Sequence, residues 1–163
     1  MEPYLKLKYN WTLWFHNPSD SNWGLDSYKK VKKVSNIKLF WELFNIIDNT
    51  LVENSMLFFM KNDIVPLWED AQNKKGGCWS FKIYKNNVFK VWEELCIRCI
   101  AQCLTKNSED GGMINGISIS PKKSFCIIKI WLKNCTMQNP SQLTSIPGLS
   151  IHGCLFKRHK PEF

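Results

Sequence analysis

Residues 116–131 read GISISPKKSFCIIKIW, which is two strand-like runs on either side of a basic turn. Successive side chains of a strand point to opposite faces, so the pattern predicts two paired strands over 116–120 and 125–133. The second strand has a wholly apolar face of Cys126, Ile128, Ile130 and Leu132 and a mixed face of Phe125, Ile127, Lys129 and Trp131. We expect helices to cover the apolar face and to leave the mixed face free for a ligand.

The rest of the chain alternates between strand-like and helix-like patterns. Alternating or short apolar runs predict strands over 5–15, 56–60, 78–84 and 149–156, and the polar run 17–22 is a loop that leads to Trp23. Helical spacing predicts helices from 37 to about 48, with Ser35 as N-cap, and from 88 to about 104, with a short third helix between Asn139 and Pro147. This order predicts an α+β fold with one helix-covered, mostly antiparallel sheet.

The overall composition is that of one soluble domain. The chain has 163 residues, 44% hydrophobic and 22% charged, which fits a single domain over 1–163. We see no apolar run that would span a bilayer and no secretion signal in MEPYLKLKY, so we expect a cytoplasmic monomer without membrane contact. Cys96, Cys99 and Cys103 share a helical face without a fourth ligand nearby; we expect them to fill the core, with no metal or cofactor.

Charge and aromatic content together indicate a nucleotide or nucleic-acid ligand. The 22 Lys and Arg exceed the 14 Asp and Glu, giving a net charge of +8, although a Lys-rich solvated surface would give the same count. The eight Trp are more informative, because a flat indole ring is often kept where a base stacks on it.

Residues 65–79, VPLWEDAQNKKGGCW, place Trp68 directly before the carboxylates of Glu69 and Asp70. An indole followed by an acid suits a guanine: the ring offers its face, and the carboxylate accepts hydrogen bonds from N1–H and the N2 amino group. If the guanine is methylated at N7, its positive charge adds a cation–π contribution. The alternative interpretation of the same residues is a core anchor followed by two solvated acids.

The chain contains, in this order, WTLWF at 11–15, Trp23 after a polar loop, NIKLFWELFN at 36–45, PLWEDAQNKKGGCW at 66–79, VWEELCIRCIA at 91–101 and GISISPKKSFCIIKIW at 116–131. Together these segments resemble the eukaryotic translation initiation factor 4E family, the messenger-RNA cap-binding proteins. The resemblance covers about residues 5–135, in order and with near-constant spacing. It implies a single curved antiparallel sheet with two to three helices on the convex face and a cap-binding concave face.

The resemblance also implies a role for individual residues. Trp23 and Trp68 would sandwich the N7-methylguanine base, Glu69 would bind its Watson–Crick edge, and Trp131 would lie against the N7-methyl group. Lys122 matches the family's phosphate-binding Arg. A convex patch of Ile37, Trp41 and Ile97 would receive an amphipathic helix of the scaffold factor 4G or of a 4E-binding repressor.

The sequence departs from the family at the phosphate-binding positions. Cys78 stands where the family has a basic residue, and Ile127 where it often has Lys. Lys129 and Lys82 fall on the same strand faces by alternation, so we expect one of them to replace the lost charge.

The partner surface and the C-terminal region also depart from the family. Leu5-Lys6 replaces a His-Pro pair, and Glu93 replaces an apolar residue, so we expect weakened or re-specified binding of ordinary 4G peptides. The chain after Trp131 is shortened, and the basic segment KRHKPEF could lie near the cap phosphates or be a solvated tail. Such trimming, with its Lys, Asn and Ile bias, would suit a parasite or a virus.

Three functions compete at this point. Initiation of translation follows most directly from the resemblance. A cap-binding repressor or decoy that does not bind 4G is the alternative, and a basic RNA-binding module with sequence-tolerant stacking is more remote. We expect no enzyme, because the sequence shows no phosphate-binding GxxxxGK loop, no His pair at metal spacing and no nucleophile beside a base.

Overall fold

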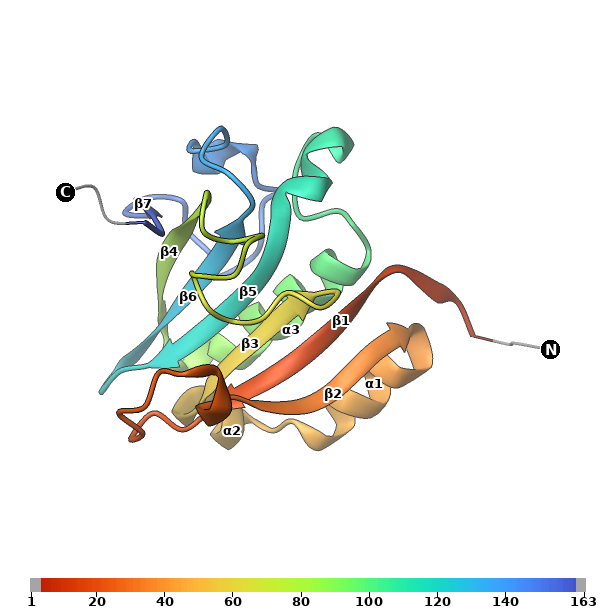
Figure 1. Cartoon of the computed structure of the whole chain (residues 1–163), viewed down its shortest axis with the longest axis vertical. Coiled ribbons are helices and arrows are strands. Elements are labelled where there is room, and N and C mark those ends of the chain that lie inside the picture. The colour runs from red at the N-terminus through yellow and green to blue at the C-terminus, as the bar shows by residue number, and fades with distance from the viewer. Residues whose placement is uncertain (1–3, 161–163) are drawn as a thin grey trace.

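Seven strands form one sheet in the order β2-β1-β3-β5-β6-β4-β7 in the computed structural model, which describes residues 4–160 (Figure 1). The strands are β1 (Lys6–His16), β2 (Lys29–Asn36), β3 (Met56–Lys61), β4 (Gly77–Tyr84), β5 (Ile114–Pro121), β6 (Phe125–Leu132) and β7 (Leu155–Arg158). Each neighbouring pair is antiparallel. The order of the strands in the sheet therefore differs from their order in the chain, and β4 lies between β6 and the C-terminal strand.

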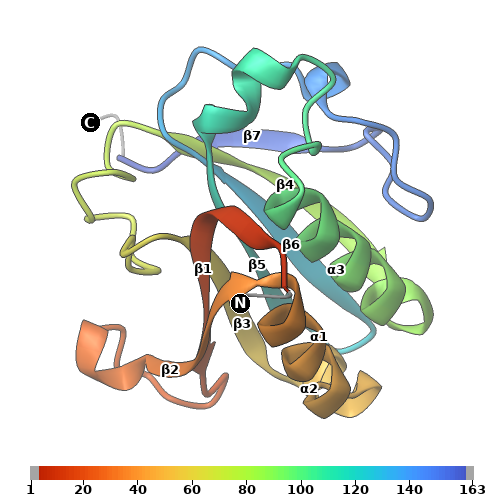
Figure 2. The same cartoon turned by 90° about the vertical axis from the view of Figure 1, so that its right-hand side faces the viewer.

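Three α-helices cover one face of the curved sheet (Figure 2). They are α1 (Ile37–Ile46), α2 (Asn49–Asn54) and α3 (Lys85–Ile100), and three short 3-10 turns complete the described structure: η1 (Leu25–Ser27), η2 (Ser108–Met113) and η3 (Pro140–Gln142). The predicted α+β fold, with a curved antiparallel sheet and helices on its convex face, is confirmed. None of the helices between residues 4 and 160 has the length and apolarity needed to cross a membrane.

The core divides in two because strand side chains alternate between the faces. The larger cluster lies between sheet and helices, and Ile128 and Ile130 of β6 contribute to it together with Trp92 and Leu95 of α3. A smaller cluster on the opposite face consists of Trp14, Phe58, Met60, Ile64 and Trp131. The apolar face of residues 125–132 is thus covered by helices, as the sequence pattern predicted, and Trp131 lies on the open face.

Two elements in the first half of the chain were not predicted. β2 is an edge strand whose sequence, KKVKKVSN, alternates poorly and buries only Val34 fully, so it lacks the apolar period that identifies a strand. The short helix α2 follows α1 directly, after Asp48, whose side chain accepts from the amide of Leu51. The prediction of Ser35 as N-cap of α1 is wrong by one residue, since Asn36 Oδ1 accepts from the amide of Leu39 at 2.8 Å.

The C-terminal quarter also differs from the prediction. The expected third helix is only the single turn η3, and the last strand covers Leu155–Arg158 instead of 149–156. Gly148 and Gly153, at φ +86° and +78°, turn the backbone between these elements, so no strand extends over 149–154. Helix α3 begins at Lys85 and ends at Ile100, earlier than predicted at both ends.

Candidate functional site

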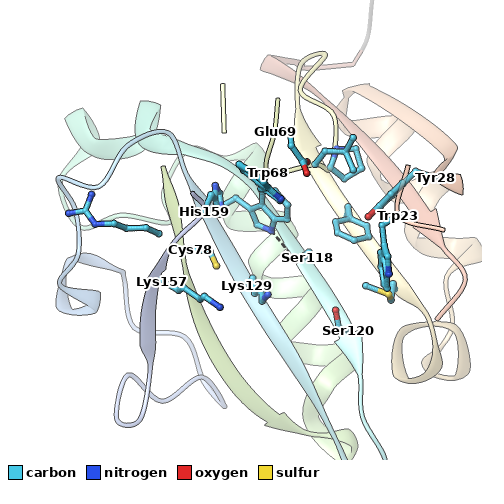
Figure 3. Close-up of a pocket in the computed structure, with 16 residues that line it drawn as sticks. Trp23, Tyr28, Trp68, Glu69, Cys78, Ser118, Ser120, Lys129, Lys157 and His159 are labelled. Atoms are coloured by element: carbon cyan, nitrogen blue, oxygen red, sulfur yellow. Dashed lines mark hydrogen bonds between the residues drawn. The ribbon is translucent and has the colours of Figure 1, made fainter. Parts of the chain in front are cut away.

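A cavity of about 430 Å³ opens on the concave face (Figure 3). Its lining includes five of the residues predicted for ligand binding: Trp23, Trp68, Glu69, Lys129 and Trp131. They come from the β1–β2 connection, the β3–β4 connection and β6, which are distant in sequence. The structure therefore brings the predicted base-binding residues together around one hollow.

Trp23 forms one side of this cavity and is supported from behind. Its indole is 54% exposed, and the ring of His16 stacks on it at 4.5 Å between centroids with an interplanar angle of 8°. His16 is fully buried, and its Nε2 lies 2.8 Å from the carbonyl oxygen of Asn22. Because one face of the indole is occupied by His16, the other face remains for a ligand.

Tyr28 joins the same side of the cavity. Its ring lies 4.6 Å from that of His16 and packs edge-on against Phe58 at 5.3 Å. Burial raises the pKa of the Tyr28 hydroxyl, and the carboxylate of Glu69 raises it further. The sequence patterns had not singled out His16 or Tyr28, because only the fold places β1 beneath Trp23.

The loop that presents Trp68 and Glu69 is fixed by the next acid, Asp70. Oδ2 of Asp70 accepts from the amide of Val65 at 3.0 Å, and Oδ1 accepts from the amide of Gln72 at 2.8 Å. Trp68 is 40% exposed, so its ring is available from the solvent side. The two acids thus have different environments: Asp70 closes the loop, and Glu69 remains exposed at the cavity.

Asn73 anchors this loop to the sheet. It is fully buried, and its side-chain amide donates to the carbonyls of Val65 at 3.2 Å and Leu67 at 2.9 Å. Its Oδ1 accepts from Nδ2 of Asn115 on β5 at 3.0 Å. Its backbone carbonyl lies 2.8 Å from Nδ1 of His159, immediately after β7. Two elements far apart in sequence therefore hold the loop in place.

Trp131 forms the floor of the cavity. It is 8% exposed, and its Nε1 donates to Oγ of Ser118 at 2.9 Å (Figure 3). The ring of Phe58 packs edge-on against it at 6.3 Å, and His159 lies 5.0 Å away on a tilted plane. Burial lowers the pKa of His159, the Asn73 carbonyl raises it, and Lys129 lowers it.

A basic wall lies around Cys78 on β4. In the β4–β7 ladder Cys78 is directly opposite Lys157, and Lys129 of β6 is opposite Ser80, two residues further along β4. Burial raises the pKa of the Cys78 thiol, while the nearby amines of Lys129 and Lys157 lower it. Both lysines line the cavity, and Figure 3 shows them close to Cys78. Lys157 belongs to the basic C-terminal segment, and at this position the segment is a paired strand and not a solvated tail.

The other two predicted phosphate-binding lysines lie outside this lining. Lys82 is exposed near the far end of β4, and its Nζ lies 4.4 Å from the ring centroid of Phe125 and 5.5 Å from that of Tyr84. Lys122 is exposed in the β5–β6 turn, where its amide donates to the carbonyl of Phe125 at 2.8 Å.

The residues predicted to receive a partner helix lie on the helix-covered side of the sheet. Ile37 and Ile97 are partly buried and pack against the main core, and Trp41 is 46% exposed and contacts Phe40 edge-on at 5.1 Å. Glu93 is half-buried on α3, and Lys6 is exposed at the start of β1.

Within residues 4–160 no group of three or more potential metal ligands occurs, and burial raises the pKa of the Cys99 thiol.

Comparisons of sequence and of fold with known proteins identify the same family. A family model described as eukaryotic initiation factor 4E matches residues 6–158. The eukaryotic translation initiation factor 4E of Candida albicans is 33% identical over 136 residues, which cover 79% of this chain and 65% of that protein. Factor 4E-2 of Schizosaccharomyces pombe is 28% identical over 136 residues, which cover 79% of this chain and 54% of that protein. The chain thus spans between about half and two thirds of the length of these relatives.

Solved structures share the same fold. The Caenorhabditis elegans eIF4E-3 in complex with the 4E-binding protein Mextli superposes with a TM-score of 0.73 at 23% identity, covering 85% of this chain and 80% of that one. A schistosome eIF4E complexed with m7GpppG and 4E-BP gives a TM-score of 0.75 at 22% identity, covering 86% of this chain and 78% of that one. With the family model matched over nearly the whole sequence, the chain belongs to the eukaryotic initiation factor 4E family.

Proposed function

We propose that this protein binds the N7-methylguanosine cap of mRNA and recruits mRNA for translation initiation. The observation that carries the proposal is that two exposed indoles, Trp23 and Trp68, and the carboxylate of Glu69 line the same cavity. The Ascaris suum eIF4E-3, which is 24% identical, has been solved with the m7G cap, and its fold is shared by this chain. The combination suits a flat, positively charged base with hydrogen-bond donors on one edge.

Each group has a distinct role in this proposal. The faces of Trp23 and Trp68 take the two sides of the base, and a cationic N7-methylguanine adds a cation–π attraction to each. Glu69 accepts from N1–H and the N2 amino group, a donor pair that adenine lacks. Trp131 stays as the apolar floor, since its own N–H is already bonded to Ser118, and would contact the N7-methyl group.

The expected affinity follows from these contacts. Stacking contributes about 1 to 3 kcal/mol per base face, and a charged hydrogen bond about 1.5 to 3 kcal/mol. Two faces and one bidentate carboxylate together approach the roughly 8 kcal/mol of a micromolar complex, before the cost of association is subtracted. The partly formed site lowers that cost, because Asp70, Asn73 and His16 already hold the loop and Trp23 in place.

The direct test is intrinsic Trp fluorescence titrated with N7-methyl-GTP and, separately, with GTP. We expect quenching by the methylated nucleotide at concentrations at least tenfold lower, because GTP lacks the positive charge on the base. Trp68→Ala and Glu69→Ala should each weaken binding of the methylated nucleotide by about tenfold or more. Equal affinity of the wild-type protein for both nucleotides would contradict cap recognition.

A matched control separates the roles of the two neighbouring acids. Glu69→Gln keeps the shape of the side chain but turns half of its acceptor edge into a donor, so it should weaken cap binding without lowering stability. Asp70→Asn should instead loosen the loop, because Asp70 accepts from the amides of Val65 and Gln72. Its loss of affinity should come with a lower free energy of unfolding.

The second candidate function keeps the cap site and changes the outcome. Glu93, half-buried on α3, places a carboxylate on the face where Ile37, Trp41 and Ile97 would receive a partner helix. Desolvating that acid under an apolar helix is unfavourable unless a cation meets it, which favours a cap-binding repressor or decoy with weak 4G binding. A pull-down on cap resin with 4G peptide separates the two, because an initiation factor binds both at once.

The remaining attributes follow from the same proposal. The protein would act as a cytoplasmic binding factor and not as an enzyme, with no cofactor. Its partners would be capped mRNA and an amphipathic 4G-type or 4E-binding-protein-type helix, and it would bind them as a monomer. The exposed Trp41 supports the helix-binding part of this proposal, since a large exposed indole on a helix favours a protein contact.

A further inference from the structure

We propose that Lys129 of β6 and Lys157 of β7 form a two-lysine clamp around Cys78 that holds the phosphates of the bound nucleotide. The inference rests on the proposed function, and it assigns the phosphate-binding end of the cavity to an element that sequence patterns left undefined. Of the two lysines expected to replace the lost charge, it keeps Lys129, and it replaces Lys82 of β4 by Lys157 of the edge strand β7.

The sheet register places both side chains on the concave face. Cys78 and Ser80 are two residues apart on β4 and share one face. Lys157 pairs directly with Cys78 from one side, and Lys129 pairs with Ser80 from the other. Residues that pair across antiparallel strands point to the same face, so the two amines approach the floor from opposite flanks of β4.

The electrostatic surroundings agree with this placement. The amines of Lys129 and Lys157 are both close enough to Cys78 to oppose the rise in its thiol pKa that burial causes. Among the ion pairs found in residues 4–160, which join Lys32 and Lys38 to Glu42 and Arg98 to Glu94, neither clamp lysine takes part. Lys129 is half-buried and Lys157 exposed, so both amines can contact a polyanion without breaking an internal ion pair.

The cavity is electrostatically divided. Figure 3 shows Glu69 beside Trp68, Trp23 apart from them on the side of Tyr28, and the clamp lysines near Cys78 in a different part of the lining. A nucleotide whose guanine edge meets the carboxylate would direct its negatively charged phosphates away from Glu69 and toward the amines. One ligand orientation therefore satisfies both ends of the cavity.

The alternative lysines are less suitable. Lys82 is four residues along β4 from Cys78, roughly 13 Å for an extended strand, and its amine contacts the ring of Phe125. Lys122 lies in the β5–β6 turn, beyond the end of the β6 strand that carries Lys129. These two exposed lysines provide matched controls, since each can be replaced with the same change of charge.

The experiment compares ligands that differ only in phosphate number. The affinities of the full chain for N7-methylguanosine and for N7-methyl-GTP are measured by Trp fluorescence in the wild type, Lys129→Ala, Lys157→Ala and the double variant. We expect each single variant to lose about three- to tenfold in affinity for the triphosphate, and the double variant to lose more. Affinity for the nucleoside should stay within about twofold. The salt dependence of triphosphate binding should also become shallower.

The controls are Lys82→Ala and Lys122→Ala, which should bind the triphosphate like the wild type. The clamp is overturned if Lys129→Ala and Lys157→Ala bind the triphosphate with wild-type affinity, or if Lys82→Ala or Lys122→Ala shows the larger loss. Failure of the proposed function would give a different result. The wild type would then bind guanosine as tightly as N7-methylguanosine, and GTP as tightly as N7-methyl-GTP. Circular dichroism of each variant checks that the substitution leaves the fold intact.

Discussion

The imidazole of His16 lies flat against the indole of Trp23, with ring centroids 4.5 Å apart and an angle of 8° between their planes. His16 is the last residue of β1 and is fully buried, whereas Trp23 is more than half exposed in the loop that follows. The buried end of a strand therefore supports one face of an exposed indole, and under the proposed function the other face would stack on the base.

Replacing His16 by Ala should weaken binding of N7-methyl-GTP by about 3- to 10-fold, because the indole loses a stacked partner of about 0.5 to 1.5 kcal/mol. His16→Phe keeps a flat ring at the same place and should recover most of the affinity. Fluorescence titration gives both values, with His152→Ala, at an exposed loop position, as the control. Wild-type affinity in His16→Ala would show that Trp23 needs no support.

Asn73→Ala should lower the free energy of unfolding by about 1 to 3 kcal/mol, because it leaves the Val65 and Leu67 carbonyls without their donor. It should also weaken cap binding, since those bonds hold the loop that presents Trp68. Urea unfolding and nucleotide titration measure the two effects. Gln72→Ala, which removes an exposed neighbouring side chain, should change neither, and an unaffected Asn73→Ala protein would refute the anchoring role.

Gly116→Ala should destabilise the sheet beneath the cavity by about 1 to 3 kcal/mol. A Cβ at this position would lie 2.5 Å from Sδ of Met60 and 2.7 Å from the carbonyl oxygen of Phe59. Gly112→Ala is the matched control, because no atom lies within 4 Å of its added Cβ. Thermal or urea unfolding of the two variants should therefore differ clearly; equal stabilities would show that Met60 moves aside without cost.

Acidification should reduce stability through His159. Burial lowers its pKa in the folded protein, so below the unfolded value of 6.5 the unfolded chain binds the proton more readily than the folded one. The stabilising contribution is full above pH 6.5 and is lost as the pH falls through the lower folded pKa. His159→Gln, which can still donate to the Asn73 carbonyl, should flatten the change in unfolding free energy between pH 7.5 and 5.5. An unchanged slope in that variant would assign the pH dependence to other groups.

Glu93→Leu should strengthen binding of an amphipathic 4G-type peptide by about tenfold, because an acid no longer has to be desolvated beneath it. Trp41→Ala, on the same surface, should weaken the same interaction and leave cap binding unchanged, since Trp41 lies on the helix-covered side. Fluorescence anisotropy with a labelled peptide measures both. A peptide that binds Glu93→Leu more weakly than the wild type would show that Glu93 meets a cation of the partner.

The strongest sequence patterns predicted the fold well where burial follows a regular period. The apolar face of β6 and the helical spacing of α1 and α3 identified those elements because each buries one face against the main core. The strand β2 was missed for the opposite reason: its lysines are mostly exposed, and pairing with β1 through backbone hydrogen bonds leaves no apolar period in the sequence. The 3-10 turn η3 has too few residues to show a helical period, so the sequence could not predict where it begins and ends.

Local sequence also determined much of the candidate site. Trp68 and Glu69 are adjacent, so their joint presentation on a loop follows from the sequence alone, and the strand alternation placed Lys129 and Trp131 on the ligand-facing side. The sequence assigned the guanine edge to Glu69 but gave no role to Asp70. Only the bonds from Asp70 to the amides of Val65 and Gln72 show that the second acid closes the loop.

What the tertiary structure alone decided is which distant segments meet. Pairing of β7 with β4 brings Lys157 opposite Cys78, across about half the chain, and also places His159 against Trp131. Strand pairing depends on backbone hydrogen bonds that every sequence can make, so it leaves no local signature, and the sequence could not decide whether the basic segment 157–160 lies near the phosphates or is a solvated tail. The sequence determined the faces of the strands and the chemistry of the Trp68–Glu69 loop; the order of the strands in the sheet decided which cations and which histidines surround it.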